Sequence, residues 1–370
     1  MLVTIIIFII ILGLLIFVHE LGHFVVAKKL GVKVEEFGFG YPPRIFGKKF
    51  KGTIYSLNWI PFGGFVKIKG EDGEDKKDKN SFSSRPIWQR VVMIIAGVVM
   101  NFLLAAFILG LGHGLGLPSP AGENYFSHAK VGQTQIQILE IAPDSPAKQN
   151  GILAGDIIKS MQATCACSCQ NKIVIPVSVT QVQDFIGQHK GQEIVLSVQR
   201  GQQTLAIKTI PRVDPPVGQG ALGVALSETV IVSYPWYLAL FKGFQTAANL
   251  TVAIVVAIAG LLWQLVSGAG SQAAAGVTGP IGIYTLTGQM ANLGFVYVLQ
   301  FIALLSLNLT IVNLLPFPAL DGGRLLFLLI EKIKGKPVNQ RVERLVHTIG
   351  FVILIILMLA VTFRDIARWF

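Results

Sequence analysis

Two histidines and one glutamate have types and spacing that suit metal-dependent hydrolysis. His19, Glu20 and His23 form the pattern His-Glu-x-x-His inside a strongly apolar stretch. Residues four apart share one face of a helix, so His19 and His23 can hold the same metal ion. Glu20 then lies beside the ligand pair, where it can contact a metal-bound water. Imidazole ligands suit zinc, and we therefore expect a zinc site with Glu20 as the catalytic base. The alternative is a set of polar groups that are merely satisfied inside a helix bundle.

The composition places this pattern in a membrane protein. Of 370 residues, 52% are hydrophobic and only 14% are charged, against about 25% charged in an average soluble domain. That balance excludes a disordered chain and argues against an ordinary soluble enzyme. Ionisable groups within a membrane helix are costly and usually mark a functional site.

Four apolar segments are predicted to cross the bilayer, since about 20 apolar residues are needed to span it. They are residues 1–27, residues 91–111, the start of residues 296–331, and residues 345–363. Residues 27–90 hold 14 Lys and Arg against 7 Asp and Glu, whereas residues 112–235 hold 8 of each. By the positive-inside rule, the loop 28–90 is cytoplasmic. The N-terminus and residues 112–295 are then expected outside.

Residues 236–266 are apolar enough to be a fifth span. If they crossed, the segment after residue 296 would run the opposite way, and the basic residues that follow Asp321 would lie outside. We therefore predict that residues 236–266, within a juxtamembrane region 213–295, lie on the membrane or against the bundle without crossing.

A third metal ligand is needed, because a catalytic zinc takes three protein ligands and one water. His19 and His23 lie about 7–14 Å along a helix from the basic cytoplasmic edge. Asp321 is the carboxylate at a matching place, and it follows Pro316 and Pro318, which cannot continue a regular helix. Broken backbone at membrane depth is tolerated only where protein or a water-filled cavity surrounds it. Asp321 is therefore the candidate third ligand; the alternative is an aspartate that caps a helix at the membrane edge.

Residues 126–212 read as a small α+β domain outside the membrane. Short alternating runs are bounded by Gly, Pro, Asp and Asn, as is typical of strands. Residues 141–161 resemble the core of a PDZ domain, with a short helix from Pro146 and a strand from Ile157. PDZ domains commonly add an extended peptide to a sheet edge. We expect either peptide binding or a role as a filter.

Three thiols stand close together in an apparent insertion of this domain, at Cys165, Cys167 and Cys169. Alternate residues of a strand share one face, so the thiols could converge. Zinc sites normally use wider spacing. A hairpin with incidental thiols is the first interpretation, and a metal or redox role is the second.

Three motifs together resemble the site-2 protease family of intramembrane zinc metalloproteases. They are His19-Glu20-x-x-His23, Gly97-x-x-x-Asn101 and Asn313-x-x-Pro316-x-Pro318-x-Leu320-Asp321-Gly322. The resemblance covers nearly the whole chain, although this chain has one PDZ-like domain where the best-known bacterial members carry two in tandem. It implies one Zn²⁺ per chain with Asp321 as third ligand, and it implies that Asn308 and Asn313 hold the substrate backbone. It also implies a multi-pass protein of the bacterial inner (cytoplasmic) membrane that cleaves the transmembrane segments of single-pass proteins, such as anti-sigma factors or signal-peptide remnants.

The cytoplasmic loop contains a further predicted element. Residues 38–40 and 47–68 alternate like a β-hairpin, and in the family such strands dip into the membrane beside the active site. The expected fold is thus a polytopic α-helical membrane protein with a membrane-associated β-hairpin and one extracytoplasmic PDZ-like domain.

Two other classes of function are open. A membrane-anchored PDZ scaffold would have no use for His19, Glu20 and Asp321 at one depth. A metal transporter would use intramembrane His and Asp as an ion path and would favour an inverted internal repeat. Nothing in the sequence indicates a nucleic-acid partner.

Overall fold

The computed structural model describes residues 2–71, 77–122, 125, 128–164, 173–267 and 278–367. They divide into two compact units. The first comprises Met1–Gly110, Phe241–Gly288 and Leu299–Phe370, and the second comprises Leu111–Leu240 and Gln289–Val298. The predictions for Cys165, Cys167 and Cys169 lie outside the described residues.

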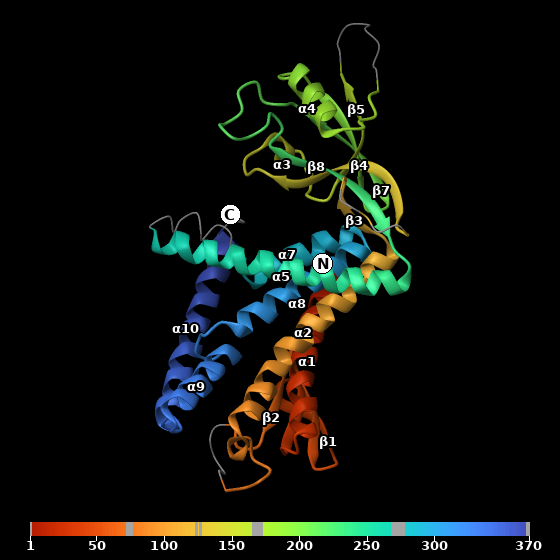
Figure 1. Cartoon of the computed structure of the whole chain (residues 1–370). Helices are drawn as coiled ribbons and strands as arrows, with labels where there is room; N and C mark the ends of the chain where they lie inside the picture. The colour runs from red at the N-terminus through yellow and green to blue at the C-terminus, as the bar shows by residue number, and fades with distance from the viewer. Residues whose placement is uncertain are drawn as a thin grey trace. The chain divides into compact units, whose positions relative to one another are not determined.

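Long apolar helices dominate the first unit (Figure 1). A helix satisfies its own backbone polar groups, which is why an apolar chain in lipid adopts it. Among the described residues, the helices outside the α+β domain are α1 (Leu2–Lys29), α2 (Ile87–Leu115), α5 (Trp236–Val266), α7 (Pro280–Leu293), α8 (Phe295–Leu314), α9 (Asp321–Lys334) and α10 (Gln340–Ala367). A 3-10 turn, η1 (Phe82–Ser84), precedes α2.

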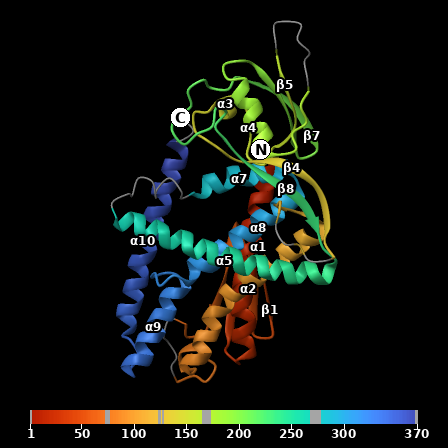
Figure 2. The same cartoon turned by 45° about the horizontal axis from the view of Figure 1, so that its top comes forward.

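Five of these helices are long and apolar enough to cross a membrane, namely α1, α2, α5, α8 and α10. Four of them contain the predicted spans, and α5 contains the predicted non-spanning segment. In both Figures 1 and 2, α5 runs crosswise to α1 and α10. It packs closely on α2, where a Cβ at Gly243 would meet the Ala106 carbonyl oxygen and the Gly110 backbone.

Small residues bring α1, α2 and α8 close together. A Cβ at Gly22 would meet the carbonyl oxygen of Ala96, so α1 and α2 approach nearly to backbone contact. The hydroxyl of Ser306 in α8 donates to the backbone carbonyl of Asn101 in α2 at 2.8 Å, and both residues are fully buried. Small residues and interhelical hydrogen bonds are the main means of helix association in lipid. These three helices therefore form a rigid support for the residues they carry.

The predicted β-hairpin is present and begins earlier than expected, with β1 (Val34–Phe50) paired to β2 (Thr53–Ile68). The two strands fold back on themselves, so that Phe37 has partners on both sides, Tyr55 and Val66. Residues 64–68 pair with β1 along one side. Among the described residues, no strand pairs with their other side.

The second unit contains a six-stranded antiparallel sheet in the order β3-β8-β4-β5-β6-β7. Its strands are β3 (Leu117–Pro120), β4 (Lys130–Ile141), β5 (Ile157–Ala163), β6 (Ile194–Arg200), β7 (Gln203–Thr209) and β8 (Val224–Ser233), accompanied by helices α3 (Pro146–Gln149) and α4 (Val179–Gln188). The predicted helix at Pro146 and strand from Ile157 are thus present. Residues 126–212 cover only part of this sheet, because β3 and β8 lie outside them and β8 pairs with β4 along most of its length.

A buried ion pair fixes one corner of this α+β domain. Asp156 is fully buried and accepts hydrogen bonds from Arg200 Nε at 2.7 Å and from the Leu153 backbone at 2.9 Å. The hydrogen bond to Asp156 raises the pKa of Arg200 above its ordinary value. A buried carboxylate is tolerated when it is paired and hydrogen-bonded in this way, so the turn before β5 is held firmly.

Candidate metal centre

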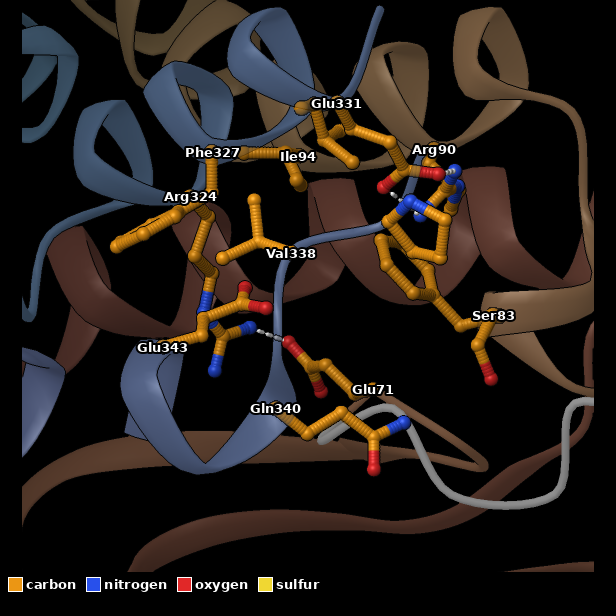
Figure 3. Close-up of a pocket in the computed structure, with 13 residues that line it drawn as sticks. Glu71, Ser83, Arg90, Ile94, Arg324, Phe327, Glu331, Val338, Gln340 and Glu343 are labelled. Atoms are coloured by element: carbon orange, nitrogen blue, oxygen red, sulfur yellow. Dashed lines mark hydrogen bonds and ion pairs between the residues drawn. The ribbon is translucent and has the colours of Figure 1, made fainter. Parts of the chain in front are cut away.

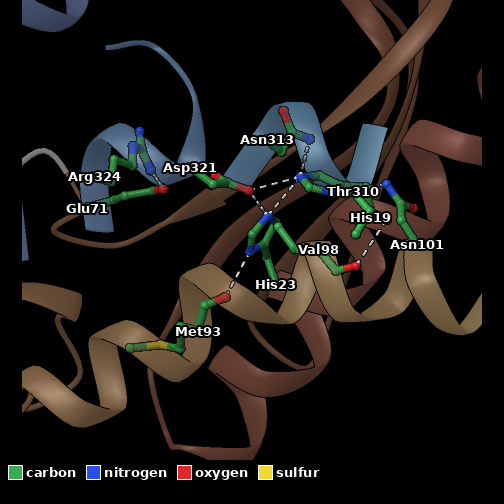
Figure 4. A network of polar contacts seen from close by, with 10 residues as sticks. All are labelled: His19, His23, Glu71, Met93, Val98, Asn101, Thr310, Asn313, Asp321 and Arg324. Carbon is green, nitrogen blue, oxygen red and sulfur yellow. Dashed lines mark hydrogen bonds and ion pairs between the residues drawn. The ribbon is translucent and has the colours of Figure 1, made fainter. Parts of the chain in front are cut away.

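His19, His23 and Asp321 converge on one point (Figure 4). Their nearest atoms are His19 Nε2 and Asp321 Oδ2 at 3.1 Å, His23 Nε2 and Asp321 Oδ2 at 3.4 Å, and the two Nε2 atoms at 3.2 Å. Among the described residues, this is the group of His, Cys, Asp and Glu arranged to hold a metal ion. The structure thus brings together the three residues that the sequence singles out as ligands.

The spacing of these atoms suits zinc. Three ligand atoms about 2.1 Å from one zinc ion at tetrahedral angles lie about 3.4 Å from one another, close to the observed separations. His23 Nδ1 lies 2.8 Å from the Met93 carbonyl oxygen, an acceptor, so Nδ1 carries the ring proton and a neutral ring turns the Nε2 lone pair inward. Asp321 Oδ2, which faces the two Nε2 atoms, is buried without a hydrogen-bond partner among the described residues, and the residues present therefore fit a zinc ion.

Helix α1 presents the two histidines on one face, at positions i and i+4. Both are buried, with 7% of His19 and 8% of His23 exposed. Gly97 of α2 makes this possible, because a Cβ there would meet the imidazole rings of both His23 and His19. The glycine of the Gly97-x-x-x-Asn101 motif is therefore needed for the space that it leaves open.

Asn101 completes the surroundings of His19. Its Nδ2 lies 3.2 Å from His19 Nδ1, and the residue is fully buried. Metal-ligating histidines usually donate their other ring N–H to an acceptor. Asn101 is placed to supply one if it turns its amide oxygen toward the ring.

Asp321 reaches the histidines because the chain breaks between α8 and α9. α8 ends at Leu314, and α9 begins at Asp321 itself. The glycines that follow allow a tight return. A Cβ at Gly322 would meet the carbonyl oxygens of Leu314 and Leu315, and one at Gly323 would meet that of Phe317. Pro316 and Pro318 lie in the break, as the sequence predicts.

Glu20 lies beside the three ligand residues and lines the same cavity, of about 330 Å³, with His19, His23 and Asp321. It lies close to β2, where a Cβ at Gly64 would be 3.9 Å from Glu20 Cγ and where Val66 lines the same cavity. Gly64 and Tyr41 of the hairpin also line this cavity. The hairpin therefore forms one wall of the candidate site.

The two predicted substrate-binding asparagines differ in position. Asn313 Nδ2 lies 3.4 Å from His19 Nε2, at the centre of the group. Asn308 Nδ2 instead donates to the carbonyl oxygen of Leu304 in its own helix at 2.9 Å, and the residue does not line the cavity. The structure thus brings Asn313, but not Asn308, to the histidines.

Sequence reasoning missed two ion pairs near the centre. Arg324, one turn after Asp321, pairs with Glu71 and lines the cavity (Figure 4). Arg90 of α2 and Glu331 of α9 pair through two contacts, at 2.6 and 3.1 Å, beside a neighbouring cavity of about 150 Å³ (Figure 3). An excess of Lys and Arg in one loop does not reveal which of them pair.

A His-Glu-x-x-His helix that meets an aspartate within a bundle of membrane-length helices has the arrangement expected of a membrane metalloprotease. The sequence profile of peptidase family M50 matches residues 7–357, and the chain belongs to this family of site-2 type zinc proteases. It is 32% identical over 452 aligned residues to the regulator of sigma-W protease RasP of Bacillus subtilis, with 99% of each chain covered. It is 29% identical over 452 aligned residues to the zinc metalloprotease RasP of Bacillus licheniformis, again with 99% of each chain covered. The chain is accordingly a multi-pass membrane protein and a zinc metalloendopeptidase.

Proposed function

We propose that this protease cleaves the transmembrane segments of single-pass membrane proteins, with His19, His23 and Asp321 as zinc ligands and Glu20 as the catalytic base. The observation that carries the proposal is the convergence of these four side chains on one cavity. The name of the Bacillus subtilis relative extends it to substrates that restrain a sigma factor. Signal-peptide remnants belong to the same chemical class.

Glu20 performs the proton transfers. When bound, zinc acidifies water to a pKa of about 7 and polarises a carbonyl oxygen. Glu20 takes a proton from the attacking water and delivers one to the leaving amine. Asn313 offers an N–H donor to the oxygen of the scissile carbonyl, where charge develops.

The hairpin offers a binding place for the substrate backbone. Peptide bonds in a helix are shielded, so cleavage requires an extended segment. Among the described residues, no strand pairs with the side of residues 64–68 that lies away from β1, and these residues line the same cavity as Glu20. An unwound substrate can add to this margin as a strand through main-chain hydrogen bonds. Asn308 contributes only if it leaves its bond to Leu304.

The proposed orientation follows the distribution of charge. Residues 28–90 and the segment between α9 and α10 carry the basic excess and lie in the cytoplasm. The PDZ-like domain then lies outside, and α5 lies along the membrane instead of crossing it, which its crosswise direction supports.

A hollow in the PDZ-like domain supports a role in peptide binding. It measures about 290 Å³ and lies between α4 and the start of β8, where it is lined by Ile186, Lys190 and residues 220–224. An apolar floor with one lysine suits an extended peptide. The same domain can instead act as a filter that excludes bulky outer regions.

The first experiment compares the wild type with Glu20→Gln and Glu193→Gln in detergent. Zinc content and cleavage of a single-pass substrate are measured together. Glu20→Gln should keep about one zinc and lose cleavage by about 10²–10⁴-fold. Glu193→Gln, on the surface of the PDZ-like domain, should match the wild type.

Each other outcome contradicts a stated part of the proposal. Equal cleavage by wild type and Glu20→Gln removes Glu20 from its role. Folded wild type without zinc contradicts the ligand set. Zinc transport into vesicles without cleavage favours the transporter class, and peptide binding with neither favours the scaffold.

A further inference from the structure

The turn at residues 317–320, just before Asp321, has an alanine at the position where glycine is usual. The Leu320 N–H donates to the Phe317 carbonyl oxygen at 3.2 Å, closing a four-residue turn with Pro318 and Ala319 in the middle. Ala319 has a φ of +77°. Proline followed by a positive φ defines a type II turn, whose third residue is usually glycine. Alanine is strained there, because its Cβ disfavours the left-handed conformation.

Helix α10 contacts the middle peptide of this turn directly. His347 Nδ1 accepts a hydrogen bond from the Ala319 N–H at 2.9 Å. One turn further along α10, a Cβ at Gly350 would meet the Cβ, C and O atoms of Pro318. Residues three apart lie on one face of a helix. One face of α10 therefore contacts both sides of the Pro318–Ala319 peptide bond.

The ring of His347 is itself held in place. Phe327 of α9 packs against it, with ring centroids 5.4 Å apart and planes inclined by 40°. Since Nδ1 accepts a hydrogen bond from the Ala319 N–H, the neutral ring carries its own proton on Nε2. The acceptor that faces the turn is thus fixed in both position and tautomer.

The contact selects one form of the turn. Types I and II differ by a flip of the middle peptide, which reverses the direction of its N–H. The type I form would relieve the strain at Ala319, but it would turn the Ala319 N–H away from His347. Asp321 follows the turn after one residue, so a turn that exchanges between the two forms would hold the Asp321 carboxylate less firmly relative to His19 and His23.

We infer that His347 is a positioning residue for the metal centre, holding the Phe317–Leu320 turn in its type II form so that Asp321 faces the two histidines. The inference rests on the proposed function, in which Asp321 is a zinc ligand. His347 does not line the cavity that contains the three proposed ligands. It acts through Ala319 and the backbone.

The test combines variants that remove the His347 acceptor with a variant that relieves the backbone strain at Ala319. His347→Leu removes the acceptor, and His347→Asn keeps one at the place of Nδ1. Ala319→Gly makes the type II form favourable without help from α10. Thr348→Ala is the matched control, because Thr348 bonds only within its own helix, to the Arg344 carbonyl oxygen.

Zinc affinity is measured on the full chain in detergent by competition with a chelator, and the visible spectrum of the Co²⁺ form reports ligand geometry. His347→Leu should weaken zinc binding by about 10–100-fold, as is usual for residues that orient a ligand. Its Co²⁺ spectrum should change. His347→Asn should bind zinc more tightly than His347→Leu, and Thr348→Ala should match the wild type.

The double variant His347→Leu/Ala319→Gly tests whether His347 acts through the turn at Ala319. Restored affinity and a wild-type Co²⁺ spectrum support the inference, because a general loss of packing would not be repaired at Ala319. A double variant as weak as His347→Leu overturns it, as does a His347→Leu protein with unchanged affinity.

Asp321→Ala, measured in parallel, distinguishes a failure of this inference from a failure of the proposed function. If Asp321→Ala loses zinc and His347→Leu does not, the inference fails and the proposed function stands. If Asp321→Ala binds zinc like the wild type, the ligand set is wrong and the inference falls with it.

Discussion

At the scale of single residues, we expect Asn101 to fix which nitrogen of His19 faces the proposed metal ion. A histidine that binds zinc through Nε2 carries its proton on Nδ1 and needs an acceptor for it. The Asn101 side chain lies 3.2 Å from that nitrogen. Rotating the amide by 180° exchanges its oxygen and nitrogen. We therefore expect the Asn101 oxygen to face His19 in the zinc-bound protein.

This orientation predicts that two substitutions of similar size at Asn101 differ in their zinc affinity. Asn101→Leu removes the acceptor and should weaken zinc binding by about 10–100-fold. Asn101→Asp presents only acceptors to His19 Nδ1 and should bind zinc more tightly than Asn101→Leu. Competition with a chelator measures both affinities.

Ser306→Ala is the control for Asn101, because it removes only the hydrogen bond to the Asn101 backbone carbonyl. Its zinc affinity should stay at the wild-type value. Weaker binding by Asn101→Asp than by Asn101→Leu would mean that Asn101 donates to the ring.

Spacing alone was sufficient to predict the histidine pair, because four residues make nearly one turn of a helix. The acceptor for His23 could not be predicted in this way, since it is the backbone carbonyl of Met93, which any residue could supply. Gly97 was predicted as part of a motif, but its reason, room for two imidazole rings, depends on how α1 packs against α2. Ala319 carries no signal at all, because its φ is set by the turn.

At the scale of elements, α9 must be tied to the bundle for Asp321 to hold its place. Arg90 of α2 and Glu331 of α9 make this tie through two parallel contacts (Figure 3). Their side chains are only 12% and 19% exposed. A bidentate pair between arginine and carboxylate adds direction as well as energy.

Breaking this pair from one side should destabilise the protein more than removing it altogether. Arg90→Met leaves the Glu331 charge poorly solvated and should lower the free energy of unfolding by about 1–3 kcal/mol, less than for a fully buried pair. The double variant Arg90→Met/Glu331→Leu should lower the free energy of unfolding by less than Arg90→Met alone. Unfolding in mixed micelles gives both values. Equal losses would indicate that the pair makes no net contribution and that only packing matters.

The elements show where a sequence pattern is informative and where it is ambiguous. The helices with uninterrupted apolar runs were predicted close to their observed bounds, whereas the first strand of the hairpin begins at Val34, before the predicted residues 38–40. β8 was missed as part of the sheet of the α+β domain because a Gly- and Pro-rich stretch, residues 211–223, separates it from β7. Its partner β4 lies far away in sequence, and pairing at such distance has no local signal.

At the scale of the whole molecule, the direction in which each helix crosses the membrane sets the side on which each site lies. Single cysteines in a background with Cys165, Cys167 and Cys169 changed to Ser test this in intact cells with an impermeant maleimide. Asp214→Cys lies before α5 in the chain and Ser267→Cys directly follows α5. Both should react from outside. Lys334→Cys should react only after permeabilisation.

A reversed result for Ser267→Cys, with reaction only after permeabilisation, would mean that α5 crosses the membrane. Reaction of Lys334→Cys in intact cells would place α9 outside and contradict the proposed orientation. All three positions are exposed in the structure, so accessibility is limited by the membrane alone.

The three proposed ligands come from distant parts of the chain, with His19 and His23 in α1 and Asp321 at the start of α9. A ribosome therefore releases the two histidines and Glu20 into the membrane long before it makes the carboxylate. On the proposal that Asp321 is the third ligand, the nascent polypeptide cannot hold its zinc firmly until almost all of it has been translated. Under the proposed function, the protease is thus inactive during most of its own synthesis.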